Sequence, residues 1–110
     1  MAEPIIVLMT AAHLEEAESI AQELVNKQLA ACVNIVPNVV SIYRWKNQVC
    51  RDPEALMIAK TTRERFAQLE QAVRHGHSYE VPEIIALPIV DGSSSYLSWL
   101  IESVASPETL

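Results

Sequence analysis

The densest group of side chains able to bind a metal ion lies in the stretch HGHSYEVPEIIALPIV, residues 75–90. Its first half carries His75, His77, Glu80 and Glu83, and its second half is an apolar run of the length of one strand. Imidazole and carboxylate ligands together suit Cu(II), Zn(II) or Ni(II). A polar cluster at the mouth of a buried strand is therefore a candidate divalent-cation site.

A structural role explains the same residues. Gly76 would force a turn, His75 would cap the end of a helix, and Tyr79 with the glutamates would anchor an interface. The spacing matches neither H-E-x-x-H nor a paired C-x-x-C. The sequence alone leaves both interpretations open, the metal site and the structural role.

Catalytic chemistry has little support, and we expect a protein that is not an enzyme. The serine run at residues 93–95 lacks the G-x-S-x-G elbow and instead suits a helix N-cap. Cys50 stands beside Arg51, but no histidine is near it in the sequence. Lys60 and the arginines after it could bind an anion or form a solvated helix face.

The charge and the apolar content of the chain argue against nucleic acid and membranes as partners. The formal net charge is −6, although residues 44–74 hold seven bases and four acids. An acidic chain disfavours nucleic acid, whose binding depends on neutralising phosphates. No run approaches the ~20 apolar residues of a membrane span, and no secretory signal is visible. We therefore expect a cytoplasmic protein, with Cys32 and Cys50 as free thiols.

Hydrophobic periodicity predicts a β-α-β-β-α-β-α order within one domain, residues 1–110. A capping box at Thr61 and Glu64 would begin the second helix, and Gly76 would end it as the C-cap. The predicted elements are a strand at 5–9, a helix at 13–29, strands at 31–43 and 49–60, a helix from Thr61 to Gly76, a strand at 81–90, and a short helix from 93–95 to 104. The first six match the ferredoxin-like α+β plan with a four-stranded antiparallel sheet.

The two middle strands form a long hairpin with a turn at residues 46–48. Pro37 cannot donate to a ladder, so we expect a bulge near Pro37 and Asn38. Each arm would span ~40–50 Å, whereas a domain of this size is about 35 Å across. The tip should therefore project beyond its own core, with Cys50 opposite residue 43 or 44 and Cys32 near Thr61.

The first and last strands are apolar on both faces, yet the two main helices of this plan cover one face only. Something must cover the other face, and the last helix is too short to do so. Self-association is the economical answer, in a ring closed by the projecting hairpins.

Five segments resemble the CutA divalent-cation tolerance family, and together they run through nearly the whole chain. They are ACVNIVP at 31–37, YRW at 43–45, KT at 60–61, HSYEVPEI at 77–84 and YLSW at 96–99. The resemblance implies a ferredoxin-like fold related to PII signalling proteins. It also implies a homotrimer built by strand pairing between subunits, and a role in tolerance of copper and other divalent metals.

Several positions depart from the family pattern. Ser78 stands where the family has Pro, and Asn47 where it has Gly. Ala11 and Ala12 stand in the first loop, where some members have a cysteine proposed to bind copper. Gly76 replaces a second histidine. Of the metal ligands that the resemblance implies, only His77 is present at its family position. With Glu80 and Glu83 of the same cluster it is the expected metal site, with Cu(II) or another divalent cation bound weakly.

A second hypothesis is a non-enzymatic PII-like signalling or scaffold trimer that binds a small anionic ligand. The ligand would lie in clefts between subunits. Four residues would form this ligand cleft: Lys60, Arg44, Tyr79 and Trp45.

Overall fold

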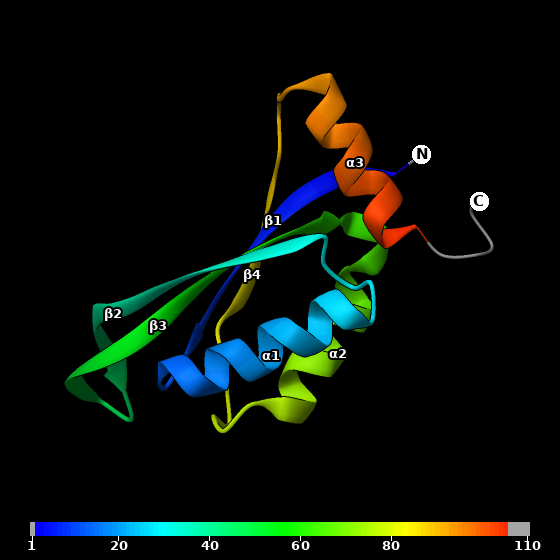
Figure 1. The fold of residues 1–110 in the computed structure, drawn as a ribbon. Helices are drawn as coiled ribbons and strands as arrows, with labels where there is room; N and C mark the ends of the chain where they lie inside the picture. Colours follow the sequence, from blue (N-terminus) through cyan, green and yellow to red (C-terminus); the bar gives the residue numbers. More distant parts are fainter. Residues whose placement is uncertain (1, 106–110) are drawn as a thin grey trace.

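A computed structural model describes residues 2–105 as a four-stranded antiparallel sheet with three α-helices (Figure 1). The elements are β1 (Pro4–Ala11), α1 (Leu14–Asn26), β2 (Cys32–Trp45), β3 (Gln48–Thr62), a 3-10 turn (Arg63–Arg65), α2 (Phe66–Gly76), β4 (Ile84–Pro88) and α3 (Ser94–Val104). The strand order is β2-β3-β1-β4. The predicted β-α-β-β-α-β-α order is confirmed. No helix in the described part of the chain is long and apolar enough to cross a membrane.

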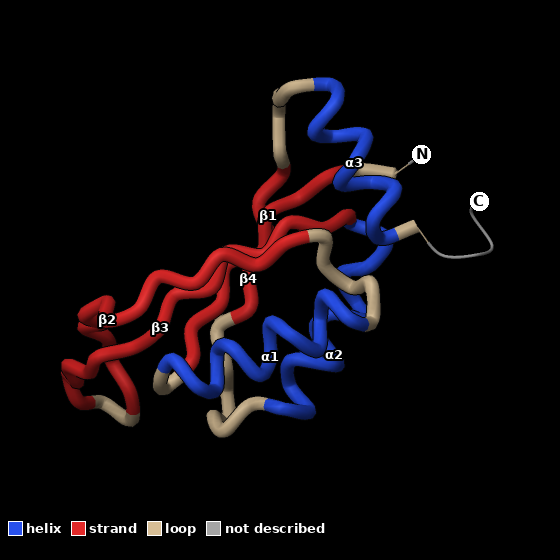
Figure 2. Tube along the Cα trace, viewed as in Figure 1, coloured by secondary structure: helices blue, strands red, loops and turns tan. Residues whose placement is uncertain are grey.

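Helices α1 and α2 lie side by side against one face of the sheet (Figures 1 and 2). That face carries alternate residues of the central strands, such as Ile5 and Val7 of β1 and Met57 of β3, all buried. They pack against the apolar stripes of the two helices, which hold Ala17, Ile20, Leu24, Leu69 and Val73. This layer is the core of the subunit.

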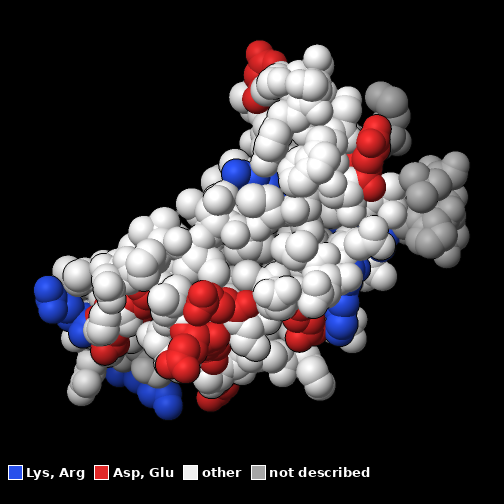
Figure 3. Space-filling view, in the orientation of Figure 1, with Lys and Arg blue, Asp and Glu red and all other residues white. Residues whose placement is uncertain are grey.

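The opposite face of the sheet, called here the open face, is also apolar. Residues directly across from one another share a face. One such row joins Ile58 of β3, Leu8 of β1 and Ile85 of β4. The next row joins Lys60, Ile6 and Leu87. Helix α3 lies at the end of the sheet away from the hairpin tip, and the surface between them is largely uncharged (Figures 1 and 3).

The β2–β3 hairpin projects as expected and gives the molecule a long axis of 47 Å against 27 and 22 Å. The ladder shifts register between Val36 and Val39, where Asn38 has a φ of 59°, so the predicted bulge is confirmed. Lys46 and Asn47 make the two-residue tip with φ values of 51° and 65°, as in a type I′ turn. Tyr43 pairs with Cys50, as predicted.

The predicted capping box is wrong. Thr61 belongs to β3, is fully buried, and its hydroxyl donates to the carbonyl of Leu29 at 2.7 Å. Glu64 instead accepts the backbone N–H of Glu3 at 3.1 Å. The strand therefore continues to Thr62, because its last residues tie β3 to the loop after α1 rather than to the next helix.

Several other boundaries also differ from the predictions. The last strand is Ile84–Pro88 rather than 81–90, because side-chain hydrogen bonds hold the residues before it in a loop. Helix α1 ends at Asn26 because Gln28 takes a φ of 58°. Gly76 is the last residue of α2 but not a left-handed cap, since neither glycine has positive φ. Cys32 pairs with Lys60, one residue from the position expected.

We predict that Thr61→Val lowers the free energy of unfolding by about 1–3 kcal/mol, because the buried carbonyl of Leu29 loses its donor. Thr61→Ser keeps the hydroxyl and is the matched control. Urea unfolding at one protein concentration measures both variants. A loss in Thr61→Ser without a loss in Thr61→Val would mean that the methyl group, and not the hydrogen bond, stabilises this corner.

Candidate functional site

The loop between α2 and β4, residues 77–83, is held by the ring of His77. Its Nε2 lies 2.7 Å from the carbonyl oxygen of Thr10, at the end of β1. Its Nδ1 accepts the backbone N–H of Tyr79 at 3.0 Å. An Nδ1 that accepts requires the proton on Nε2, which then donates to Thr10. The His77 side chain is 0% exposed, so both ring nitrogens are occupied inside the subunit.

Glu16 joins the start of α1 to the same loop. Its carboxylate accepts the N–H of Ala12 at 3.1 Å and that of Ser78 at 3.0 Å. It also lies 4.0 Å from Nδ1 of His77. Burial alone would raise the pKa of this carboxyl, but the hydrogen bonds from Ser78 and Ala12 and the nearby imidazole outweigh it. The pKa of Glu16 is therefore lowered from its usual value.

Tyr79 connects the loop to the base of the hairpin. Its hydroxyl donates to the buried carboxylate of Glu54 on β3 at 2.7 Å. The centre of its ring lies 4.8 Å from that of His77, with the two ring planes tilted by 47°. Burial, and then the bond to Glu54, raise the pKa of Tyr79. Further along the hairpin Tyr43 donates to Asp52, and this bond is the main cause that raises the pKa of Tyr43 to about 12. Both phenols therefore hold their protons as donors to carboxylates.

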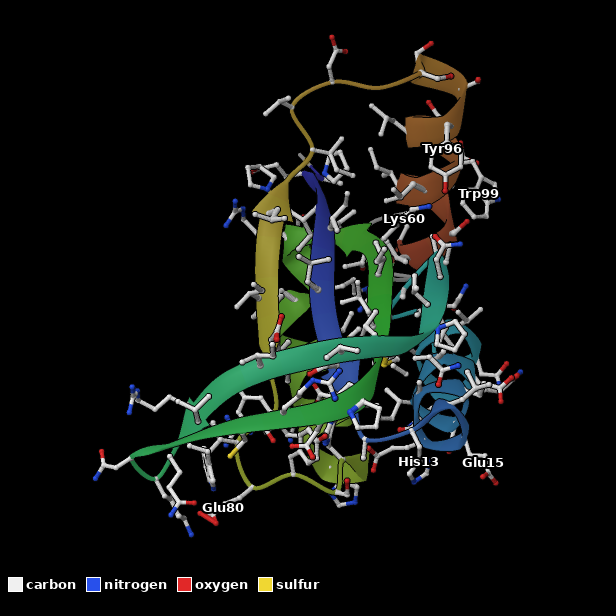
Figure 4. All side chains as sticks on the ribbon, turned by 90° about the vertical axis from the view of Figure 1, so that its left-hand side faces the viewer. His13, Glu15, Lys60, Glu80, Tyr96 and Trp99 are labelled. Carbon is white, nitrogen blue, oxygen red and sulfur yellow. The ribbon has the colours of Figure 1, made fainter. Side chains whose placement is uncertain are left out.

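The expected metal ligands do not form a ready metal site in the subunit. Within residues 2–105 no three His, Cys, Asp or Glu side chains group closely enough to hold a metal ion. His77 is buried with both nitrogens engaged, whereas Glu80 and Glu83 are exposed. Figure 4 shows Glu80 at the lower end of the molecule. His75 lies exposed at the end of α2, as the helix-end interpretation predicts.

The expected ligand cleft is likewise not assembled within one subunit. Arg44 and Trp45 are at the hairpin tip, where Trp45 pairs with Gln48. Lys60 is twelve residues further along β3, or about 40 Å of strand. Tyr79 lies between these ends, at Glu54. Any cleft that joins the four must use more than one copy of the chain.

Sequence reasoning missed Glu16 and Glu54 as partners of the 77–83 loop. Glu16 lies in the first turn of α1, where the helix dipole favours any acid, so its presence there gave no separate signal. Glu54 had a signal that could have been used: it shares a strand phase with Leu56 and Ile58, so it should face the same partly covered surface. A carboxylate in such a place needs a donor, and Tyr79 supplies it.

The fold and the loop define a class of protein: a split β-α-β domain with an extended hairpin and an added C-terminal helix. The family model described as CutA1 divalent ion tolerance protein matches residues 5–103, and the chain belongs to this family.

Similar proteins agree with this assignment. The divalent-cation tolerance protein CutA of Thermus thermophilus is 50% identical over 98 residues, which are 89% of this chain and 95% of that protein. Its solved structure has a TM-score of 0.91 at 48% identity and covers 93% of this chain and 99% of its own. A structure titled periplasmic divalent cation tolerance protein CutA, from Archaeoglobus fulgidus, has a TM-score of 0.90 at 42% identity and covers 93% and 99%.

A third relative is longer. Protein CutA, chloroplastic, of Arabidopsis thaliana is 44% identical over 99 residues, and the match covers 90% of this chain but 54% of that protein. The printed names of relatives thus include a chloroplast and a periplasmic protein. The family description and the names of the Thermus and Archaeoglobus proteins refer to divalent-ion or divalent-cation tolerance.

We predict that Glu16 makes stability fall with acid. A carboxyl whose pKa is lowered on folding stabilises the protein fully above its unfolded pKa, near 4.5. That contribution is lost as the pH falls through the folded pKa. Wild type should therefore be more stable than Glu16→Gln at pH 6, and the difference should shrink below about pH 4.5.

Thermal unfolding between pH 3 and 6 measures this difference. Glu18→Gln, at an exposed position of the same helix outside these hydrogen bonds, is the control. A gap between wild type and Glu16→Gln that stays constant over the whole range would contradict the assignment.

Proposed function

We propose that this chain works as a homotrimer in the response to divalent cations, with copper as the first candidate. The observation that carries the proposal is the apolar open face. In the isolated subunit Ile85 is 51% exposed, and Leu87 beside it is exposed as well. A contiguous apolar surface of this kind favours contact with another protein surface.

The shape of the subunit supports a closed ring. The hairpin reaches beyond its own core, and its tip exposes Tyr43, Trp45 and Val49. A tip that rests on a neighbour makes a head-to-tail contact, and such contacts form rings when the rotation closes. The number three rests on the family resemblance. The edge strands β2 and β4 are available for pairing between copies.

The cation response is supported by the family description and by the printed names of relatives. The proposed location is the cytoplasm, which is consistent with the free thiols of Cys32 and Cys50. Copper binding at His77, Glu80 and Glu83 is proposed to be weak. A cation could use His77 only after a ring nitrogen gives up its partner, Thr10 or Tyr79.

We predict that wild type has a mass of about 37 kDa by light scattering, three times the 12.2 kDa of one chain. Ile85→Glu should dissociate it, because each copy would bring a charge into the covered face. Val90→Glu is the matched control, since Val90 is 92% exposed and lies beyond β4. Circular dichroism checks that each variant is folded.

A wild-type mass near that of one chain would contradict the trimer. The link to function is tested in cells that lack the gene and grow in excess copper. Wild type and Val90→Glu should restore growth, whereas Ile85→Glu should not.

For the metal site we predict weak Cu(II) binding by calorimetry, reduced in His77→Ala. His77→Ala also removes the bonds that hold the loop, so the double variant Glu80→Gln, Glu83→Gln gives a second test at exposed positions. His75→Ala is the control for an exposed imidazole outside the site. Equal binding by wild type and both site variants, or none in any, would remove copper binding from this loop.

A further inference from the structure

Lys60 is a half-buried cation at the end of the open face near α3. Its Nζ donates to Oδ1 of Asn34 at 2.8 Å and lies 5.9 Å from the centre of the Tyr96 ring. Its neighbours across the ladder are Cys32 and Ile6. The ammonium group therefore rests on an amide oxygen, an aromatic ring and apolar strands.

Lys60 is one of two half-buried bases without a carboxylate partner; the other, Arg65, donates to the carbonyl of Val104 at 2.6 Å and to the side chain of Gln68 at 2.7 Å. Lys27, Arg63 and Arg74 each have a carboxylate oxygen within 3.0 to 3.7 Å. In the part of the chain that the structure describes, no such partner lies within 4.0 Å of Lys60. The bases near the hairpin tip also lack one, but they lie on the exposed surface.

Two aromatic rings stand beside this lysine on α3. Tyr96 and Trp99 are three residues apart on the helix, and their ring centres are 5.4 Å apart. They are 41% and 46% exposed in the isolated subunit. Figure 4 shows Lys60, Tyr96 and Trp99 together at the upper end of the molecule. A cation beside two part-exposed rings can hold a charged group and the flat group attached to it.

Self-association would leave the charge of Lys60 without an opposite charge beside it. A second copy on the open face would take the ammonium of Lys60 further from water, and a buried charge without an opposite charge is costly. The Asn34 oxygen contributes a dipole but no charge. The assembled protein therefore needs one negative charge at Lys60.

We propose that the assembled protein binds a small aromatic monocarboxylate at the border between two copies. Its carboxylate lies on Lys60, and its ring lies on Tyr96 and Trp99. One negative charge balances one ammonium group, whereas a doubly charged phosphate would add a surplus charge to a chain of net charge −6. The proposal rests on the self-association proposed above, because the second copy is what makes the anion necessary.

Calorimetric titration with benzoate and with indole-3-carboxylate tests the site. Benzamide has the ring without the charge, acetate has the carboxylate without the ring, and inorganic phosphate is an anion with neither ring nor carboxylate. We expect both aromatic carboxylates to bind at least about tenfold more tightly than these three probes. Equal affinity for benzoate and benzamide would overturn the proposal.

Variants locate the site. Lys60→Gln keeps the length of the side chain without its charge, and Trp99→Leu removes a ring. Each should weaken benzoate binding at least about tenfold. Arg74→Gln removes a base on the outer surface of α2 and should leave binding unchanged.

Light scattering on the same samples separates this inference from the proposed function. A trimer that binds no aromatic carboxylate overturns the site and leaves self-association intact. A neighbour's carboxylate would then be the partner of Lys60, and Lys60→Gln would weaken the trimer without any ligand. A wild-type monomer overturns both proposals. Dissociated Ile85→Glu should bind benzoate at least about tenfold more weakly than wild type, since without the second copy Lys60 stays in contact with water.

Discussion

The sheet has two apolar faces, and the chain supplies helices for only one of them. Helices α1 and α2 bury Ile5, Val7 and Met9, whereas Leu8 and Ile85 on the open face stay at least partly exposed. Burial of apolar surface is the main favourable contribution to folding. In a chain that leaves one face of its sheet uncovered, burial of that face can therefore stabilise association with another copy. Three other features relate to this open face: the hairpin reaches beyond the core toward the proposed neighbouring copy, the third helix is too short to cover the face, and Lys60 lies at its end.

The loop after α2 shows how polar groups can fix a hairpin without forming a reactive site. His77 binds the end of β1, Glu16 binds the same loop from α1, and Tyr79 binds Glu54 on the hairpin. Every group in this network has a partner, and no buried side-chain nitrogen or oxygen in the described residues lacks one. His77, which resembles a metal ligand in the sequence, instead holds the loop against the end of β1, and this agrees with weak rather than strong cation binding.

The elements and the bulge were predictable because they follow from periodicity and from single residues such as Pro37 and Asn47. The start of α2 was not, because the sequence around Thr61 and Glu64 has the form of a capping box. A distant carbonyl, that of Leu29, takes the hydroxyl that the local pattern assigns to the helix. The hydrogen bonding of His77 could not be predicted either, since its partner Thr10 is 67 residues away in the sequence. Residue types identify what a side chain can do, whereas its partner decides what it does.

The bulge at Asn38 has a consequence for how this chain can change its length. From Val36 to Val39 the chain of β2 advances three residues while its partner β3 advances two, so β2 has one extra residue at the bulge. Side chains of β2 that would face one side of the sheet therefore face the other side beyond the bulge. Between the bulge and the tip the two-residue turn fixes the register, and this register brings Tyr43 to Cys50 and Asp52. A single-residue insertion between the bulge and the tip would turn Tyr43 and Trp45 to the opposite side, whereas an insertion of two residues in each arm would lengthen the hairpin and keep every contact direction. Viable variants of hairpin length should therefore differ by even numbers in each arm.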